Sequence, residues 1–348
     1  MHPSEEFKRK LLEPIDALFK EALDSHAPPA GMGGRNYQPP WVGLWPSGDG
    51  NASKKKPGNH KKKTGIVDEK ALEEALYAMN GLIGLHAAKR SILRLADFAR
   101  IEAERRRLKL PRSEVTFHCV FTGSPGTGKT SFARLLAKIF KALGLLKSGH
   151  TVEVDKSALV GEYLGQTPSK VKGVFDQADE GVLFIDEAYS LTHDREDLYG
   201  REAIDMMIKL MEDRRDRVVV IVAGYPKEMK EFIRSNPGLR SRFNRTVHFA
   251  DYDAAELLAI QKQMLRSIGF EASDGLLLRS ELMWQQLYTD RMTGDANGRM
   301  VRSALEIMLE NQAGRLVHEP KKQRHELCEL LPQDLDGVEQ MLRENHED

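Results

Sequence analysis

Eight residues, GSPGTGKT at 123–130, have the types and the spacing needed to hold a polyphosphate. They follow a short apolar run and open the helical pattern SFARLLAKIFKAL. Their glycines let the backbone curl so that successive N–H groups and the positive end of the helix face an anion. The segment therefore predicts a phosphate-binding loop. The residues expected to contact a nucleotide are Gly123, Ser124, Pro125, Gly126, Thr127, Gly128, Lys129, Thr130 and Ser131.

Within this loop, Lys129 supplies a point charge for the β- and γ-phosphate oxygens, and the hydroxyl of Thr130 is placed to hold Mg²⁺. A second pair of reactive residues, Asp186 and Glu187, ends the apolar run GVLFI. Carboxylates at the carboxyl end of a parallel strand lie where open α/β sheets bind ligands. Asp186 is expected to complete the Mg²⁺ site, and Glu187 to orient and activate the attacking water. The two motifs together predict a nucleotide hydrolase.

Short β-branched runs, alternating with helical periods, must position these residues. This alternation is typical of a parallel sheet covered by helices, so it predicts an α/β domain over residues 68–250. The expected strands lie at 117–123, 151–155, 181–187, 218–224 and 246–250.

Beyond the last of these runs, helical periods take over, which predicts a small all-helical lid domain at 251–316. A polar tail with one short helix near its end is expected at 317–348.

The N-terminal part has a different character. Apolar positions after Pro14 follow a helical period, which predicts a short amphipathic helix within residues 1–26 that needs a partner surface. Residues 27–67 are rich in Gly, Pro and Lys and predict a flexible linker. Trp41 and Trp45 could form a docking motif there or cover the folded body. The lysine run from Lys54 to Lys63 could contact an acidic partner or nucleic acid, but a solvated linker is favoured.

Composition narrows the classes further. The 348 residues carry 52 Lys and Arg against 52 Asp and Glu, so no net charge draws the chain to nucleic acid. Cys119 and Cys328 lack metal-ligand spacing, and reduced thiols are expected. No apolar stretch approaches the ~18 residues of a membrane span, and the first twenty residues lack the core of a secretory signal. We expect a cytoplasmic protein without membrane insertion.

Longer strings resemble the AAA+ ATPases, and within them the group that holds the CbbX (CfxQ) rubisco activases, the stage V sporulation protein K-like proteins and the EccA ATPases. The resemblance covers about 81–316 and implies a P-loop α/β core with a helical lid. It also implies a homo-oligomeric, hexameric ring with ATP between neighbouring subunits and a protein substrate. It rests on ALVGEYLGQTPSKVKGVFDQA at 158–178, GVLFIDEAYSL at 181–191, YGREAIDMMIKLMEDRRDRVVVIVAGYP at 199–226 and NPGLRSRF at 236–243.

Two loops take roles from this resemblance. Ile83 and Gly84, in the string GLIG, resemble the segment that contacts adenine, the alternative being a helix N-cap. Tyr163, Leu164 and Gly165 occupy the place of the pore loop with which similar rings grip an extended polypeptide. An exposed aromatic offers contact area at small entropic cost, so it can hold many sequences. An ordinary packed tyrosine is the alternative.

The resemblance also assigns arginines, whose planar fork suits the charge on a γ-phosphoryl group. Arg242 is expected to be the arginine finger that acts on the next subunit's nucleotide, and Arg240 either competes for that role or supports it. Arg299 resembles the sensor-2 arginine, with Arg302 as its substitute and a solvated helix face as the alternative. Tyr225 is a secondary candidate for sensor 1, because many AAA+ proteins have Asn or Thr where this chain reads AGYP.

These residues support two functions of different classes. The first is a ring motor that hydrolyses ATP to remodel a protein partner or thread it through a pore. The second is an ATP-dependent assembly switch or scaffold whose N-terminal region recruits a partner without threading. DNA remodelling draws only on the lysine run. Rubisco or a secretion substrate cannot be chosen as the partner from motifs that these relatives share.

Overall fold

The computed structural model describes residues 67–111, 116–163, 165–192, 197–292, 296–319 and 323–347. All of them belong to one compact unit of the chain, Gly50–Asp348. The predicted N-terminal helix, the linker up to residue 66 and Leu164 lie outside the described residues.

Five parallel strands form the central sheet in the order β2–β3–β4–β1–β5. The strands β1, β3 and β4 are buried along their whole length, as expected for a parallel sheet covered on both faces. The five strands predicted from the sequence are thus confirmed. Their bounds are β1 Cys119–Thr122, β2 Thr151–Val154, β3 Gly181–Ile185, β4 Val218–Gly224 and β5 Thr246–His248.

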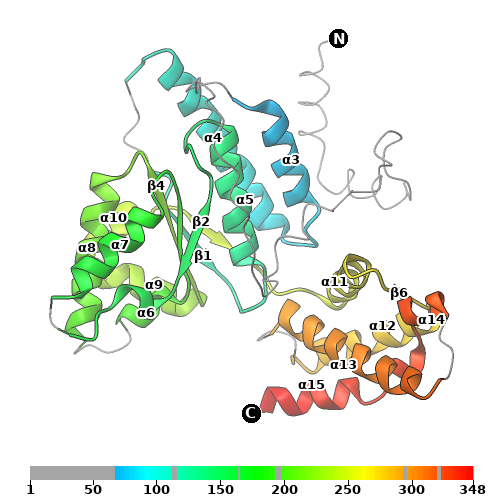
Figure 1. Cartoon of the computed structure of the whole chain (residues 1–348). Helices are drawn as coiled ribbons and strands as arrows, with labels where there is room; N and C mark the ends of the chain where they lie inside the picture. The colour runs from blue at the N-terminus through cyan, green and yellow to red at the C-terminus, as the bar shows by residue number, and fades with distance from the viewer. Residues whose placement is uncertain are drawn as a thin grey trace, which may run out of the picture. The chain divides into compact units, whose positions relative to one another are not determined.

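Helices cover both faces of this sheet (Figure 1). On one face lie α3 Glu69–Asn80, α4 His86–Arg107 and α5 Lys129–Ala142. On the other lie α6 Lys156–Leu159, α7 Thr167–Gln177, the 3₁₀ turn η1 Ala188–Thr192, α8 Leu198–Asp213, α9 Pro226–Ser235 and α10 Pro237–Arg242. The first turn of α5 has no side-chain cap, so its N–H groups are available to an anion.

The lid is built around the fully buried Trp284. The indole Nε1 donates to Gln261 Oε1 at 2.6 Å, and Gln261 Nε2 donates to Ser280 Oγ at 2.9 Å. This satisfied polar chain ties the first two lid helices together. The lid helices are α11 Ala254–Ser267, α12 Asp274–Thr289, α13 Gly298–Val317, α14 Arg324–Cys328 and α15 Val338–Glu347, with the 3₁₀ turn η2 Pro332–Leu335.

The segment after residue 317, expected to be a separate polar tail, packs onto the lid helices. Arg315 on α13 donates to both carboxylate oxygens of the buried Asp334 at 3.0 Å. Gln312 donates to the carbonyls of Glu326 and Glu329. The lid therefore continues through α15. It is not purely helical, because the short strands β6 Glu271–Ala272 and β7 Glu329–Leu330 pair in parallel.

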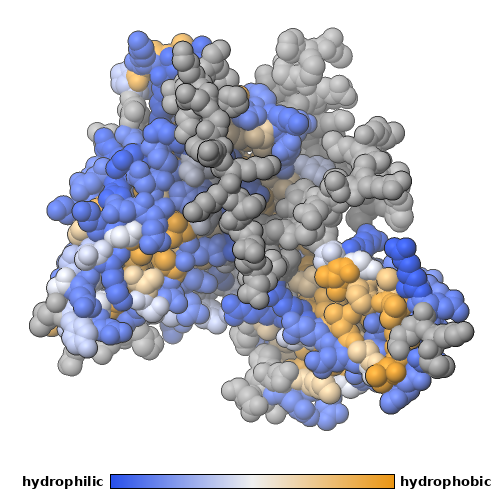
Figure 2. Space-filling view, in the orientation of Figure 1, coloured by the Kyte–Doolittle hydropathy of each residue, from blue (hydrophilic) through white to orange (hydrophobic). Residues whose placement is uncertain are grey.

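Hydrophobic side chains gather on part of the lid surface (Figure 2). An exposed apolar area of this kind is typical of an interaction surface. The strongly exposed large hydrophobic residues of the lid are Ile268, Leu278, Leu282, Tyr288, Val317, Leu327 and Met341. Within the described ranges, none of the helices has the length and apolar character to cross a membrane.

Candidate nucleotide site

The loop between β1 and α5 requires glycine at three positions. Gly123, Gly126 and Gly128 have φ angles of 154°, 72° and 89°, which side-chain-bearing residues rarely adopt. A Cβ on Gly126 would also lie 2.2 Å from the carbonyl oxygen of Ala296. The predicted curl of the backbone is therefore present, and the start of the lid helix α13 presses against it.

Lys129, at the start of α5, is the charged centre of this loop. Its Nζ donates to the carbonyl oxygens of Gly123 and Ser124, both at 2.8 Å, and its exposed fraction is only 9%. Burial lowers the pKa of Lys129, and four charges modify that effect. These charges belong, from the largest influence to the smallest, to Asp186, Arg299, Asp251 and Glu187. The charges of three predicted site residues, Asp186, Arg299 and Glu187, thus act on the predicted lysine.

Asp186 and Glu187 follow the last residue of β3, as predicted. The Oδ1 atom of the half-buried Asp186 accepts a hydrogen bond from the N–H of Glu187 at 3.1 Å. Glu187 is exposed and has a φ of 47°, a strained value for a residue other than glycine. Such strain is typical of functional positions. Here the left-handed φ takes the backbone at Glu187 out of the extended conformation of β3.

The donors expected for Mg²⁺ fit a hard cation. Thr130 is half-buried in the first turn of α5, and the charge of Asp186 acts on the neighbouring Lys129. A hydroxyl and a carboxylate are oxygen ligands of the kind that Mg²⁺ takes alongside phosphate oxygens and water. Within the described part of the chain, no cluster of three or more His, Cys, Asp or Glu side chains could hold a metal by itself. These residues therefore fit a cation that takes its remaining oxygen ligands from phosphate and water.

An unpredicted residue, Tyr189, explains the glycine at the end of β4. A Cβ on Gly224 would lie 2.7 Å from Cδ1 of Tyr189, so the ring occupies the space of a side chain there. The ring centroids of Tyr189 and Tyr225 are 6.2 Å apart. Burial, followed by the charge of Glu187, raises the pKa of Tyr189. The ring that adjoins Gly224 is therefore Tyr189, which lies two residues after Glu187 in the string DEAY.

Two further unpredicted residues join the loop to the lid. Asn297 is fully buried; its Oδ1 accepts from the N–H of Tyr252 at 2.9 Å, and its Nδ2 donates to Asp251 Oδ1 at 3.0 Å. The hydroxyl of Tyr252 donates to the carbonyl of Thr127 at 3.2 Å, and burial raises the pKa of that tyrosine. Gly298 N donates to Gly126 O at 3.2 Å. In the sequence, the only signal for this contact between loop and lid is the Asn-Gly dipeptide that precedes a helical period.

The hydrogen bond between Gly298 and Gly126 places Arg299, the second residue of α13, next to the phosphate-binding loop. Arg299 itself is exposed to solvent. Its substitute candidate Arg302 is half-buried one turn later. Gly84, expected at the base of the nucleotide, precedes α4 with a φ of 60°, and Leu85 follows with a φ of 58°. The Cδ1 atom of Leu85 lies 3.7 Å from the position of a Cβ on Gly128. The two segments predicted to contact base and phosphate therefore adjoin.

The two competing arginines differ in their surroundings. The half-buried Arg242 forms an ion pair with Glu212 at 3.3 Å and donates to Gly238 O and Ser241 Oγ, both at 3.4 Å. Arg240, on the same short helix α10, is exposed. Neither is among the principal charges that act on Lys129.

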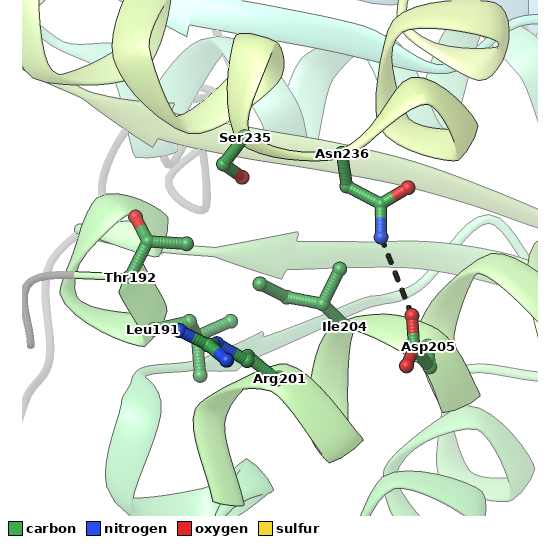
Figure 3. A pocket seen from close by; sticks show the side chains of 7 residues that line it. All are labelled: Leu191, Thr192, Arg201, Ile204, Asp205, Ser235 and Asn236. Atoms are coloured by element: carbon green, nitrogen blue, oxygen red, sulfur yellow. Dashed lines mark hydrogen bonds between the residues drawn. The ribbon is translucent and has the colours of Figure 1, made fainter. Parts of the chain in front are cut away.

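A cavity of about 310 Å³ lies beside the start of α10 (Figure 3). Asn236 at its edge donates to Asp205 Oδ1 at 3.3 Å and accepts from the N–H of Gly238 at 2.7 Å, as the N-cap of α10. These bonds fix the helix that carries both arginines. The lining residues are Leu191, Thr192, Arg201, Ile204, Asp205, Ser235 and Asn236.

The segment expected to be a pore loop lies between α6 and α7. Tyr163 has an exposed fraction of 69%, so it is not a packed core tyrosine. The base of the loop is anchored, because Gly161 N donates to Oγ1 of the buried Thr167 at 3.1 Å. Gly165 has a φ of 82° and open space around it. The structure thus presents an exposed aromatic on a loop with a fixed base.

Comparison with known proteins agrees with this geometry. Residues 119–251 match the model of the ATPase family associated with various cellular activities (AAA), and residues 253–345 match the AAA lid domain. The chain is 36% identical to stage V sporulation protein K of Bacillus subtilis, over 76% of this chain and 82% of that protein. It is 43% identical to the chloroplastic ribulose bisphosphate carboxylase/oxygenase activase of Cyanidioschyzon merolae, over 69% and 82%. It is 41% identical to protein CfxQ of Xanthobacter flavus, over 72% and 79%.

Among solved structures, the FIGL-1 AAA domain in complex with ADP has a similar fold, with a TM-score of 0.53 and 18% identity. The alignment covers 76% of this chain and 83% of that domain. The family and its relatives show that the chain binds and hydrolyses ATP. With its P-loop, acidic pair and lid in the expected places, the chain belongs to the AAA ATPase family, in the group of stage V sporulation protein K and CfxQ.

Proposed function

We propose that the protein is a ring-forming ATPase that hydrolyses ATP at the interfaces between its subunits and uses the energy to remodel a protein partner. The identity of the charges that act on Lys129 is the observation that carries this proposal. The principal charges that act on Lys129 include Arg299 but neither Arg240 nor Arg242. An arginine finger stabilises the charge on a transferring γ-phosphoryl group. Since Arg240 and Arg242 are not among the charges at the site of their own subunit, we propose that a second copy of the chain supplies the finger.

Within one subunit, we propose a simple distribution of roles. The N–H groups of the loop and of the uncapped first turn of α5 bind the phosphates. Lys129 exchanges its two carbonyl acceptors for phosphate oxygens. Thr130 and Asp186 would hold Mg²⁺, which neutralises phosphate charge when bound. Glu187 orients the attacking water and accepts its proton.

We propose that Arg240 enters the neighbouring site. Its exposure and the capped start of α10 support this role. The ion pair of Arg242 with Glu212 supports a different one, in which Arg242 holds α10 in place. If Arg242 instead leaves Glu212 on assembly, it would be the finger, as the sequence suggested.

Subunit mixing tests this arrangement. Lys129→Ala subunits cannot hold nucleotide but retain their arginines, whereas Arg240→Ala subunits hold nucleotide but lack the finger. Each variant alone should lose at least about 10³-fold in kcat, in line with the value of an arginine finger. Mixed, they should recover a measurable fraction of wild-type ATPase activity, because an intact site then faces an intact arginine.

The matched control replaces the first partner with the Lys129→Ala, Arg240→Ala double variant, and that mixture should stay inactive. Recovery in the control would contradict the interface site, whereas full activity of Arg240→Ala alone would exclude Arg240 as the finger. The same mixing with Arg242→Ala identifies which arginine acts. Sedimentation in the presence of ATP measures the ring, for which we propose six subunits.

We further propose that the ring acts in the cytoplasm and that Tyr163 grips an extended polypeptide. Exposure of this ring on an anchored loop supports that role. Tyr163→Ala should keep basal ATPase activity and lose its stimulation by the partner, while Tyr163→Phe should keep both. If Tyr163→Ala retains partner-stimulated turnover, the loop does not thread and the assembly-switch function is favoured.

Rubisco, named for the Cyanidioschyzon merolae relative, is the first partner to test. A Glu187→Gln ring loaded with ATP should retain its bound protein partner, so the proteins captured with it identify that partner without a prior choice.

A further inference from the structure

Lys89 on α4 is a lysine with no exposed surface. Its Nζ donates to the carbonyl oxygen of Leu82 at 2.6 Å and to that of Asn80 at 3.2 Å. Fully buried lysines are rare unless their ammonium group is paired. The two carbonyls lie on either side of Gly81, at the start of the segment 81–84 that is expected to contact the base of the nucleotide. The ammonium group therefore fixes this backbone from the interior of the domain.

The lid helix α11 contacts the same segment. Gln263 Nε2 donates to Gly81 O at 3.2 Å. A Cβ on Gly84 would lie 2.2 Å from Glu256 Oε1, so the carboxylate of Glu256 packs directly on the glycine Cα. The other oxygen of Glu256 accepts from Asp253 N at 3.0 Å in the capping box of α11. Because of that bond, the position of this carboxylate follows the first turn of the lid.

Lys89 and Glu256 also influence one another electrostatically. Burial lowers the pKa of Lys89 to about 8, and the charge of Glu256 partly opposes that change. Burial raises the pKa of Glu256, and the hydrogen bond from Asp253 N–H opposes that change, followed by the charges of His86 and Lys89. In both groups desolvation has the larger influence on the pKa, and the attraction between the two charges opposes it.

The segment between these groups cannot hold its shape unaided. Gly84 and Leu85 are consecutive residues with left-handed φ angles of 60° and 58°, and this conformation is unfavourable for leucine. Leu85 also adjoins Gly128 of the phosphate-binding loop. A shift of the segment would therefore move the wall of the nucleotide site.

We propose that Lys89 and Glu256 form a positioning pair that shapes segment 81–84 as the base-recognition edge of the nucleotide site and couples that edge to the lid. This rests on the proposed function, in which the site binds ATP, and on the expectation from the sequence resemblance that segment 81–84 contacts the base. Discrimination between purines depends on where buried donors and acceptors stand, so the groups that fix this backbone determine which base binds. The phosphate-binding loop sets affinity for phosphates whatever the base.

The test is calorimetric binding of ADP and of GDP to the full chain carrying Lys89→Met, Glu256→Gln or Arg90→Met. Arg90 is the exposed neighbour on α4 and provides the matched control. Lys89→Met removes two charge-assisted hydrogen bonds at nearly constant length, so ADP should bind about tenfold more weakly or worse. GDP should change by less than about threefold, because its phosphates still meet an intact loop. The preference for ADP over GDP therefore collapses.

Glu256→Gln keeps the size of the side chain and loses its charge, and it should reduce the ADP preference by about threefold. Arg90→Met should keep the wild-type ratio. A Lys89→Met protein with the wild-type ADP-to-GDP ratio, or with equal losses for both nucleotides, would overturn the proposal. If Lys89→Met does not fold, a wild-type ratio in Glu256→Gln would overturn it equally.

Lys129→Ala separates the two levels of inference. Loss of both ADP and GDP in that variant supports the phosphate site on which the proposed function depends. Undiminished binding of both would overturn the proposed function. The purine ratio of the Lys89 and Glu256 variants tests the positioning pair separately.

Discussion

The nucleotide end of the sheet and the segments around Tyr163 and Arg240 are organised in opposite ways. At the nucleotide end, polar side chains have partners within the chain: Lys129 bonds two loop carbonyls, and Tyr252 and Asn297 tie the loop to the lid. Tyr163 and Arg240, in contrast, are exposed on segments whose bases are fixed by hydrogen bonds. This difference agrees with the function that we propose, in which one chain binds ATP and other chains are needed for efficient turnover and work on a partner.

The largest expected effect is a loss of ATP hydrolysis in a variant that keeps the contacts within the nucleotide site. Glu187→Gln removes the group that we propose accepts a proton from water, so kcat should fall by about 10²- to 10⁴-fold. Binding of ATP should be unchanged, because Glu187 is not among the groups that hold the loop. Single-turnover ATPase assays and calorimetry measure both quantities. Weakened ATP binding equal to the loss in kcat would contradict this separation.

A second prediction concerns the packing of Tyr189 on Gly224. Gly224→Ala places a methyl group 2.7 Å from the Tyr189 ring, and overpacking of this kind should lower the free energy of unfolding by about 1–3 kcal/mol. Adding Tyr189→Ala should recover much of the loss that Gly224→Ala causes, so the two changes are not additive. Urea denaturation of the four proteins gives the coupling, and strict additivity would show that the ring does not occupy this space.

A third prediction follows from the buried lysine. Its native pKa of about 8 lies below the ordinary lysine pKa of 10.5 that the unfolded chain has. Between these pH values the unfolded chain holds a proton that the native chain has released, so this group makes stability rise with pH. The rise should be about 2 kcal/mol from about pH 8 to about pH 10. Lys89→Met should lack it. Denaturant midpoints of both proteins at the two pH values check the sign, and parallel pH profiles would contradict it.

The smallest effect distinguishes the two arginines. Arg242→Ala removes the ion pair with Glu212 and two long hydrogen bonds, so it should lower the free energy of unfolding by about 1 kcal/mol. The partner carboxylate is half-exposed to solvent, which limits the loss. Arg240→Ala should leave the stability of the lone subunit within about 0.5 kcal/mol of wild type. Equal losses in thermal or urea denaturation would remove the difference between the two sites.

Much of this architecture could be predicted from the sequence because its signals are local. The GSPGTGKT string needs its glycines for backbone reasons that the φ angles of Gly126 and Gly128 confirm. The β-branched runs predicted all five strands of the sheet, since buried parallel strands are continuous apolar runs. The acidic pair followed from its place after such a run.

The remaining site residues depend on contacts between distant segments. Tyr189 fills the space at Gly224, and Asn297 bonds Asp251 and Tyr252, 45 or more residues earlier in the chain. No local period contains that information. Lys89 did leave a trace, because it falls on the apolar stripe of α4 with Ile92 and Ala96. A lysine on such a stripe signals a buried ammonium group, although its acceptors cannot be deduced from the pattern.

The helix α13 has a mechanical consequence. It begins where Gly298 bonds Gly126 and continues for 20 residues, which corresponds to a rod of about 30 Å. A rotation of only about 5° at its first turn would displace its far end by about 2.6 Å, since displacement grows with the length of the lever. Arg315 and Gln312 near that end carry the C-terminal segment along with it. A sub-ångström adjustment around the phosphates would thereby be amplified into a larger shift of the C-terminal segment.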